Sequence, residues 1–389
     1  MTDNNGDAPD PYEDARIRGL CEDGADEVAA RRVPDSRRDR MLRSPQWRGR
    51  SFGNSTPVAM GFKPGVERPS LRELLCGTDR QFPVAALPMV DPVPHWRTRP
   101  RSGLRITRLG HSTLLVEMDG ARILTDPVWG ERASPLPFAG PRRFHPPPAS
   151  IDALPPLDAI IISHDHYDHL DRPTIRQLRH LDVPLITSLG VGTILEQWGI
   201  AADRITELDW WESATVRGLG VTAAPAQHFS GRGVRDRNAT LWSSFLLRGP
   251  HHSFYYGADS GLNGDFPEIA SRLGPFDAIA LEIGAFHPAW GDIHMGPAGA
   301  IEAWRSLGGV LLPIHWGTFN LAVHPWDEPA DTVVDLAASA GATLLMPRFG
   351  EPVEPDAAGT VDRWWSAVAA DRAADVDDAP DVPLEEIPD

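Results

Sequence analysis

The chain has 389 residues, of which 41% are hydrophobic and 23% are charged. This composition supplies enough apolar side chains for a folded core and excludes a globally disordered chain. The 37 basic and 54 acidic residues give a net charge of −17 at pH 7. Because contacts with phosphates depend on clusters of Lys and Arg, this charge disfavours general nucleic-acid binding and opposes electrostatic attachment to anionic lipid.

The two cysteines, Cys21 and Cys76, lie far apart, and no Cys-x-x-Cys pair occurs. This excludes a zinc site built from thiolates and a thioredoxin-type redox site. Two distant thiols are typical of a reduced intracellular protein, and the polar, acidic N-terminus has no apolar signal-peptide core. No stretch approaches the ~20 apolar residues of a membrane-spanning helix, so we expect a cytoplasmic protein with at most peripheral membrane contact.

Four regions are predicted along the chain. The polar, highly charged residues 1–40 predict a disordered N-terminal tail. Residues 41–103 are rich in proline but carry large aromatic residues, which indicates an extended segment packed on the core. Residues 104–365 predict the main folded domain, and the acidic residues 366–389 predict a disordered C-terminal tail.

Within the main domain, strand-like and helix-like segments alternate. The segments with strand character are 104–110, 112–118, 121–126, 158–163, 183–188, 220–227, 241–247, 253–259, 277–284 and 310–316. The segments with helix character are 173–181, 296–307 and 328–340. Asp119-Gly120 predicts a tight hairpin turn, and Asp171 with Pro173 predicts the start of a helix. The pattern indicates an α/β protein with mixed sheets and covering helices.

The strongest functional signal is the motif HDHYDH at residues 164–169, directly after a predicted buried strand. Three imidazoles and a carboxylate within six residues are typical of metal ligands. Side chains two residues apart in extended backbone point the same way, so His164 and His166 can reach one ion, while Asp168 and His169 point at a second. The alternative, a solvated polar loop, is disfavoured because α/β folds place ligand sites at strand ends.

Three more candidates, His228, Asp259 and His315, each follow an apolar run. A strand-end His or Asp alone is more often a hydrogen-bonding group, so the metal interpretation depends on the motif. The first predicted ligand group is His164, His166, His228 and Asp259. The second is Asp168, His169, His315 and Asp259, with Asp259 bridging. Imidazole and carboxylate ligands without thiolate favour Zn²⁺, with Mn²⁺ or Fe as weaker candidates.

These motifs resemble the metallo-β-lactamase superfamily, and within it the N-acylphosphatidylethanolamine-hydrolysing phospholipase D family with its bacterial members. The resemblance covers residues 44–350. Its matching stretches include LGHSTLLVEMDG, ILTDPVWGERASP, GPRRFHPPP, AQHFSGR, YYGADSGL and IHWGTFNLA. The resemblance implies an αβ/βα sandwich, in which two mixed sheets flanked by helices hold the metals at one edge.

The resemblance also implies a binuclear zinc phosphodiesterase of phospholipase D type that hydrolyses N-acylphosphatidylethanolamine or a related phospholipid by metal-bound hydroxide. It assigns two zinc ions per chain to the seven ligands His164, His166, Asp168, His169, His228, Asp259 and His315. The family's histidine near the phosphate matches His294, although the surrounding segment matches only loosely. Asp165 stands where the family often has Asn, which adds negative charge near the metals.

Other candidate residues have two interpretations each. Asp168 is expected to orient the nucleophile as well as to ligate. His294 either contacts the phosphate and protonates the leaving group or makes a structural hydrogen bond. His111 either supports a ligand or, as we prefer, packs in the core or a loop. Arg232 either binds the phosphate or is a solvated loop residue.

We therefore expect a phospholipid or another phosphodiester as the binding partner and no nucleic acid. The oligomeric state is open, with a homodimer among the alternatives. The first alternative function is a hydrolase of the same fold that acts on a lactone or a soluble phosphodiester. A nuclease is disfavoured by the net charge of −17. A non-catalytic zinc-binding protein would be indicated by a broken ligand set, whereas the set here is complete.

Overall fold

The computed structural model describes residues 36–58, 63, 65–70, 80–290 and 292–368. The chain divides into two compact units, 1–36 and 37–389, and only Ser36 of the first is described. Most of the predicted N-terminal tail and nearly all of the predicted C-terminal tail therefore lie outside the described residues. The part of the N-terminal prediction that is described includes a helix, α1 (Arg37–Arg43).

Seven described strands form the first sheet, in the spatial order β13, β1, β2, β3, β4, β5 and β6. Strands β13 and β1 to β3 pair antiparallel, whereas β3 to β6 pair parallel. The bounds are Leu104–Arg108 (β1), Leu114–Met118 (β2), Ala121–Thr125 (β3), Ala159–Ile162 (β4), Leu185–Ser188 (β5), Ile205–Leu208 (β6) and Pro352–Val353 (β13).

The second sheet has six described strands, in the order β12, β11, β10, β9, β8 and β7. Strands β10 to β12 pair parallel, whereas β7 to β10 pair antiparallel. The bounds are Ser213–Val216 (β7), Leu219–Ala224 (β8), Ser244–Arg248 (β9), Ser253–Tyr256 (β10), Ala278–Glu282 (β11) and Val310–Ile314 (β12). Both sheets are mixed, as predicted.

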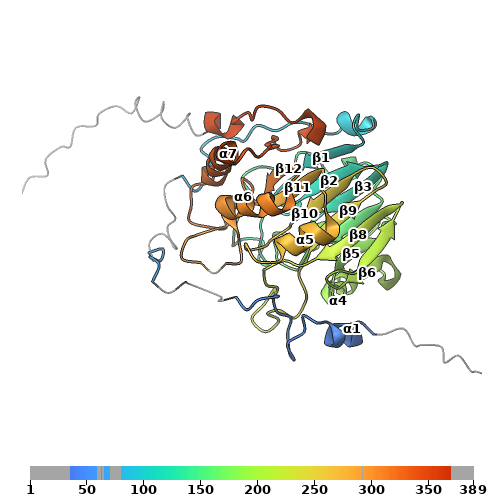
Figure 1. Ribbon diagram of the computed structural model, residues 1–389. Coiled ribbons are helices and arrows are strands. Elements are labelled where there is room, and N and C mark those ends of the chain that lie inside the picture. The colour runs from blue at the N-terminus through green and yellow to red at the C-terminus, as the bar shows by residue number, and fades with distance from the viewer. Residues whose placement is uncertain (1–35, 59–62, 64, 71–79, 291, 369–389) are drawn as a thin grey trace, which may run out of the picture. The chain divides into compact units, whose positions relative to one another are not determined.

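Helices cover the outer face of each sheet (Figure 1). Helices α3 and α4 pack on the first sheet, and α5, α6 and α7 pack on the second. Their bounds are Arg172–Leu178 (α3), Val191–Gln197 (α4), Phe266–Leu273 (α5), Gly296–Leu307 (α6) and Glu328–Ala340 (α7). The predicted αβ/βα sandwich is confirmed. None of the described helices is both long and apolar enough to span a membrane.

The core depends on strands whose two faces are both buried. Ile123 and Ile161 of the first sheet pack against Phe245 of the second in the space between the sheets. Ile160 and Ile162 point to the other face of β4 and pack beneath α3 and α4. Successive strand residues face opposite sides, so a strand that is buried on both sides has a continuous apolar sequence.

The predicted hairpin turn between β2 and β3 is confirmed. Asp119 and Gly120 have φ angles of 50° and 88°, and Met118 pairs with Ala121 across the turn. Positive φ at both central residues is the requirement of a type I′ turn. The Asp119 carboxylate also accepts a hydrogen bond from the backbone N–H of His252 at 3.1 Å, and Oδ1 lies 2.6 Å from Nδ1 of the same histidine. This contact joins the hairpin of the first sheet to the β9–β10 turn of the second.

The predicted helix start at Asp171 is also confirmed. The side chain of Asp171 accepts a hydrogen bond from the backbone N–H of Thr174 at 3.1 Å, as an N-cap residue does. Pro173 lies in the first turn of α3, where its missing N–H has no intrahelical partner to lose.

A buried charge network crosses β1, β2 and β3. Glu117 lies opposite Arg105 on one side and Arg122 on the other. Its carboxylate is 2.6 Å from the Arg105 guanidinium and 3.1 Å from Nε of Arg122, and only 4% of its side chain is exposed. Removal of one member of such a pair leaves an unpaired buried charge, which is costly in a medium of low polarity.

We predict that Glu117→Gln lowers the free energy of unfolding by about 3 kcal/mol, because Arg105 would stay buried beside a neutral amide. Urea unfolding at pH 7 measures the change. The control is Glu302→Gln, which removes an exposed partner of Arg305 on α6 and should cause no measurable loss. Equal losses in the two variants would contradict the assignment of a buried network.

Candidate metal centre

The carboxyl ends of the parallel strands bring most of the predicted site residues to one edge of the sandwich. The motif at 164–169 begins two residues after β4, Asp259 lies three residues after β10, and His315 directly follows β12. The backbone is left-handed at two of these turns, with a φ of 50° at Ala258 and 63° at His315. Such conformations are unfavourable for residues other than glycine and are found mainly where function requires them.

The first predicted ligand group is assembled with its donor atoms facing one another. Nδ1 of His166 lies 2.9 Å from Nε2 of His164 and 3.1 Å from Nε2 of His228. Oδ2 of Asp259 lies 3.8 Å from Nε2 of His164 and 3.6 Å from Nε2 of His228. Four ligands at 2.0–2.1 Å around one zinc ion are about 3.3 Å apart, so these spacings suit a tetrahedral ion.

The second group contains the predicted Asp168, His169 and His315, and His111 in addition. Oδ2 of Asp168 lies 3.3 Å from Nε2 of His111, 3.5 Å from that of His315 and 3.7 Å from that of His169. Oδ1 of Asp259 is 3.0 Å from Nε2 of His169. Because Asp259 also provides Oδ2 to the first group, its carboxylate has the position of a bridging ligand.

His111 is the main departure from the sequence analysis, which preferred a core or loop role. It is buried, but its ring lies 3.8 Å from that of His315, and both of its ring nitrogens are buried without a hydrogen-bond partner among the described residues. Nε2 of His169 and both ring nitrogens of His315 are likewise buried without a hydrogen-bond partner among the described residues. Buried polar atoms are normally satisfied, and a bound cation would satisfy one nitrogen of each ring.

The charges at the site also fit a cation. Burial lowers the pKa of His315, but the carboxylates of Asp259 and Asp168 outweigh burial and raise it to about 10. Burial lowers the pKa of His164 and His228 well below the ordinary value, so both rings are in the neutral form that ligates. The carboxylates therefore attract positive charge to the site. Without a metal, a proton on His315 provides this charge, and a divalent ion can provide it instead.

Asp126, which the sequence analysis did not select, supports the second group from behind. Its Oδ2 lies 2.7 Å from Nδ1 of His169 and accepts a hydrogen bond from the Tyr256 hydroxyl at 2.6 Å. Its Oδ1 accepts from the backbone N–H of Ser163 at 2.7 Å. A carboxylate on the outer nitrogen of a histidine fixes the ring so that its other nitrogen faces the metal. The sequence signal that could have identified Asp126 is its position directly after the strand 121–125.

Glu282, the last residue of β11, was also missed, and it holds the predicted His294 at the site. Oε2 of Glu282 lies 2.5 Å from Nδ1 of His294, and Oε1 accepts from the backbone N–H groups of Ser260 and Met295 at 3.0 and 3.2 Å. The ring of His294 is 5.0 Å from that of His315. Its Nε2 is left as the ring nitrogen that can meet a substrate.

Arg232 is not the solvated loop residue of the second interpretation, because its side chain is partly buried and hydrogen-bonded to the motif loop. Nη1 of Arg232 donates to the backbone carbonyls of Asp165 and Leu170 at 2.5 and 2.8 Å, and its Cζ lies 3.9 Å from the Tyr167 ring centroid. The side chain therefore holds the motif loop in place. Contact with phosphate, the other interpretation, stays a prediction, and Nη1 is already engaged with the chain itself.

The charge that Asp165 adds to the motif is directed away from both ligand groups. Its Oδ1 accepts from the backbone N–H of Gly231 at 2.7 Å, and its Oδ2 accepts from the Thr240 hydroxyl at 3.1 Å. Burial raises the pKa of Asp165, which these two hydrogen bonds partly offset. Asp165 thus joins the motif loop to the segment that follows His228.

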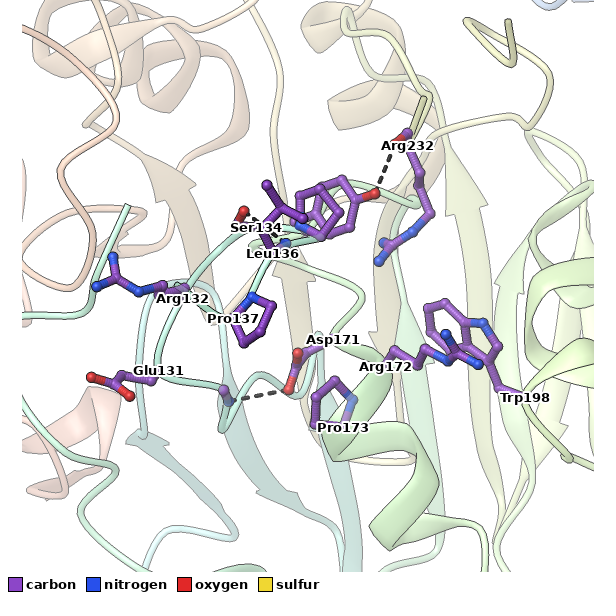
Figure 2. A pocket seen from close by; sticks show the side chains of 13 residues that line it. Glu131, Arg132, Ser134, Leu136, Pro137, Asp171, Arg172, Pro173, Trp198 and Arg232 are labelled. Carbon is purple, nitrogen blue, oxygen red and sulfur yellow. Dashed lines mark hydrogen bonds between the residues drawn. The ribbon is translucent and has the colours of Figure 1, made fainter. Parts of the chain in front are cut away.

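A cavity of about 430 Å³ lies beside the motif loop. Figure 2 shows its lining, in which the segment 130–137 faces Asp171, Arg172, Trp198 and Arg232. The carboxylate of Asp171 accepts a hydrogen bond from the backbone N–H of Gly130 at 3.1 Å, which connects the segment 130–137 with the opposite side of the cavity. The lining combines proline, leucine and tryptophan side chains with several arginines, and Tyr167 of the motif forms part of it.

Comparisons with known proteins agree with this geometry. Residues 121–316 match the model of the β-lactamase superfamily domain. A protein of Mycobacterium tuberculosis, described as uncharacterized, is 42% identical over 88% of this chain and 91% of its own length. The N-acyl-phosphatidylethanolamine-hydrolyzing phospholipase D 1 of Caenorhabditis elegans is 39% identical over 60% of this chain and 70% of its own length.

A solved structure shares the fold. The isothiocyanate hydrolase from Delia radicum gut bacteria superposes with a TM-score of 0.52 at 20% identity, over 64% of this chain and 98% of its own. The segment that matches the family model contains all seven predicted ligands. The chain therefore belongs to the metallo-β-lactamase superfamily, and its relatives there include N-acylphosphatidylethanolamine-hydrolysing phospholipases D.

Proposed function

We propose that this chain is a binuclear zinc hydrolase of phospholipase D type that cleaves N-acylphosphatidylethanolamine or a related phospholipid. The observation that carries the proposal is the pair of ligand groups with the Asp259 carboxylate between them and His294 beside them. The nematode phospholipase, at 39% identity, supports the choice of substrate. The interfacial location of such a substrate implies peripheral contact with a membrane.

Zinc is the metal that best fits the donors. The two groups contain imidazole and carboxylate donors and no thiolate, and their spacings suit a small ion with four ligands. Harder ions such as Mg²⁺ prefer oxygen ligands alone, which makes them poor candidates for sites rich in histidine. Mn²⁺ and Fe remain weaker alternatives.

Two divalent cations, when bound, supply Lewis acidity toward the phosphate and toward a water molecule. Asp168 is the ligand carboxylate that faces solvent, since 14% of its side chain is exposed against 1% for Asp259. It is therefore placed to orient the attacking water. The water oxygen bonds to phosphorus while the bond from phosphorus to the ethanolamine oxygen breaks, and the leaving oxygen takes up a proton.

His294 is the residue placed to deliver that proton. Glu282 holds the ring of His294 through Nδ1, so Nε2 is the nitrogen that can pass a proton to the leaving oxygen. The products are phosphatidic acid and an N-acylethanolamine. Asp126 and Glu282 contribute by fixing the rings of His169 and His294, and neither needs to touch the substrate.

We predict that His164→Ala binds one metal ion per chain instead of two and loses hydrolytic activity, because the first group loses a ligand. Metal content is measured by mass spectrometry after zinc loading and dialysis, and turnover on the same samples. The control is His180→Ala, which changes an exposed histidine beyond the end of α3 and should keep both ions. Two ions and unchanged turnover in His164→Ala would contradict the mechanism.

We predict that the zinc-loaded chain converts N-acylphosphatidylethanolamine in mixed micelles into equal amounts of phosphatidic acid and N-acylethanolamine. Mass spectrometry detects both products, and His164→Ala is the blank. If the wild type binds two ions but yields neither product, the substrate assignment is wrong. Lactones and soluble phosphodiesters, the alternative substrates for this fold, would then be screened.

We predict that His294→Gln lowers the turnover number by about 10²-fold, the lower range for loss of a general acid, while both ions stay bound. Turnover and metal content are measured in parallel. Full turnover in this variant would show that His294 makes only a structural hydrogen bond.

A further inference from the structure

Arg143 is a partly buried arginine whose guanidinium nitrogens are enclosed without a hydrogen-bond partner among the described residues. Its Nε, Nη1 and Nη2 are all buried without a hydrogen-bond acceptor among the described residues. Burial lowers the pKa of Arg143 to about 10, and the charge of Asp171 offsets only part of this effect. A guanidinium carries five N–H donors, and burying them unpaired is unfavourable unless something else satisfies them.

The Arg143 guanidinium lies beside the second ligand group, and its backbone contacts one wall of the neighbouring cavity. Nη2 lies 3.3 Å from the place that a Cβ atom at Gly110 would occupy, next to His111 of the second ligand group. On another side, the Arg143 backbone N–H donates to the Glu131 carbonyl at 2.9 Å, and Glu131 lines the cavity of Figure 2. Asp171, whose charge acts on Arg143, lines the same cavity.

Other buried or partly buried arginines are engaged, which sets Arg143 apart. Arg232 donates to two backbone carbonyls, as described above. The guanidinium of Arg108 donates to the Trp316 carbonyl and is stacked 4.6 Å from the Trp316 ring centroid and 4.3 Å from that of Phe349. For Arg143 the nearest ring is that of Phe319, at 5.9 Å from Cζ. No hydrogen bond among the described residues engages its guanidinium, so its N–H donors are available to a ligand.

We infer that Arg143 binds a phosphate oxyanion beside the second ligand group. The planar fork of a guanidinium matches two phosphate oxygens, and such a contact is strongest where water is excluded. That the phosphate belongs to a phospholipid rests on the proposed function. Free phosphate offers the same oxyanion, so it can serve as a probe that does not depend on turnover.

The test compares Arg143→Gln with Arg142→Gln in the zinc-loaded full-length chain. Arg142 is the adjacent residue, 66% exposed and paired with Glu131, and is therefore a matched control. Binding of inorganic phosphate is measured by calorimetry, metal content by mass spectrometry, and the melting temperature by scanning calorimetry. The KM for N-acylphosphatidylethanolamine is measured on the same preparations.

We predict that Arg143→Gln raises the Kd for phosphate and the KM for the lipid by about tenfold or more, the effect of losing a charged hydrogen bond. Both ions stay bound, and the melting temperature stays unchanged or rises, because an unpaired buried charge has been removed. Arg142→Gln changes none of these quantities. Arg143→Lys keeps the charge but not the fork and recovers part of the affinity.

A structural role for Arg143 gives the opposite pattern and would overturn the inference: a lower melting temperature with unchanged phosphate affinity, or failure of both Arg143 variants to fold. A wild type that does not bind phosphate would also overturn it. If Arg143→Gln loses phosphate binding but the wild type does not cleave the lipid, the inference stands and the proposed substrate fails. Lipid cleavage with the same KM in wild type and Arg143→Gln would overturn the inference and leave the proposed function intact.

Discussion

The buried carboxylate of Asp259 is the constraint around which the site is arranged. Burial alone would raise its pKa, but His169 and His315 outweigh burial and hold the pKa of Asp259 well below its usual range. An ionised carboxylate in the interior requires positive charge close on more than one side. The parallel strands β4, β10 and β12 meet this requirement because their carboxyl ends place histidines from both sheets around one residue.

The layered fold is predictable from the sequence because its central strands are buried on both faces. The run 159–162 is wholly apolar and cannot be mistaken for a surface segment. Segments without such signals are missed. Strands β6 and β7 are short and partly exposed, and β13 has two residues. Helix α4 begins after Gly190 without a capping side chain, so its sequence has no start signal.

The seven predicted ligands lie together because the motif at 164–169 specifies the chemistry and each distant ligand follows a strand. The supporting residues Asp126 and Glu282 are different. Their roles depend on contacts between side chains from separate strands and loops, which no local pattern encodes. Arg232 illustrates the same limit. Its place beside the motif suggests a contact with a ligand, whereas its observed hydrogen bonds go to the backbone carbonyls of Asp165 and Leu170.

The contact between Asp119 and His252 has a consequence for how the two sheets are held. It joins the β2–β3 turn to the β9–β10 turn at the end of the strands opposite the metal groups. The sandwich is thus joined at both ends, by the hydrogen bonds of Asp119 at one and by the facing ligand groups at the other. The contact between Asp119 and His252 involves no residue of either ligand group, so the two sheets are joined at that end whether or not a cation is bound.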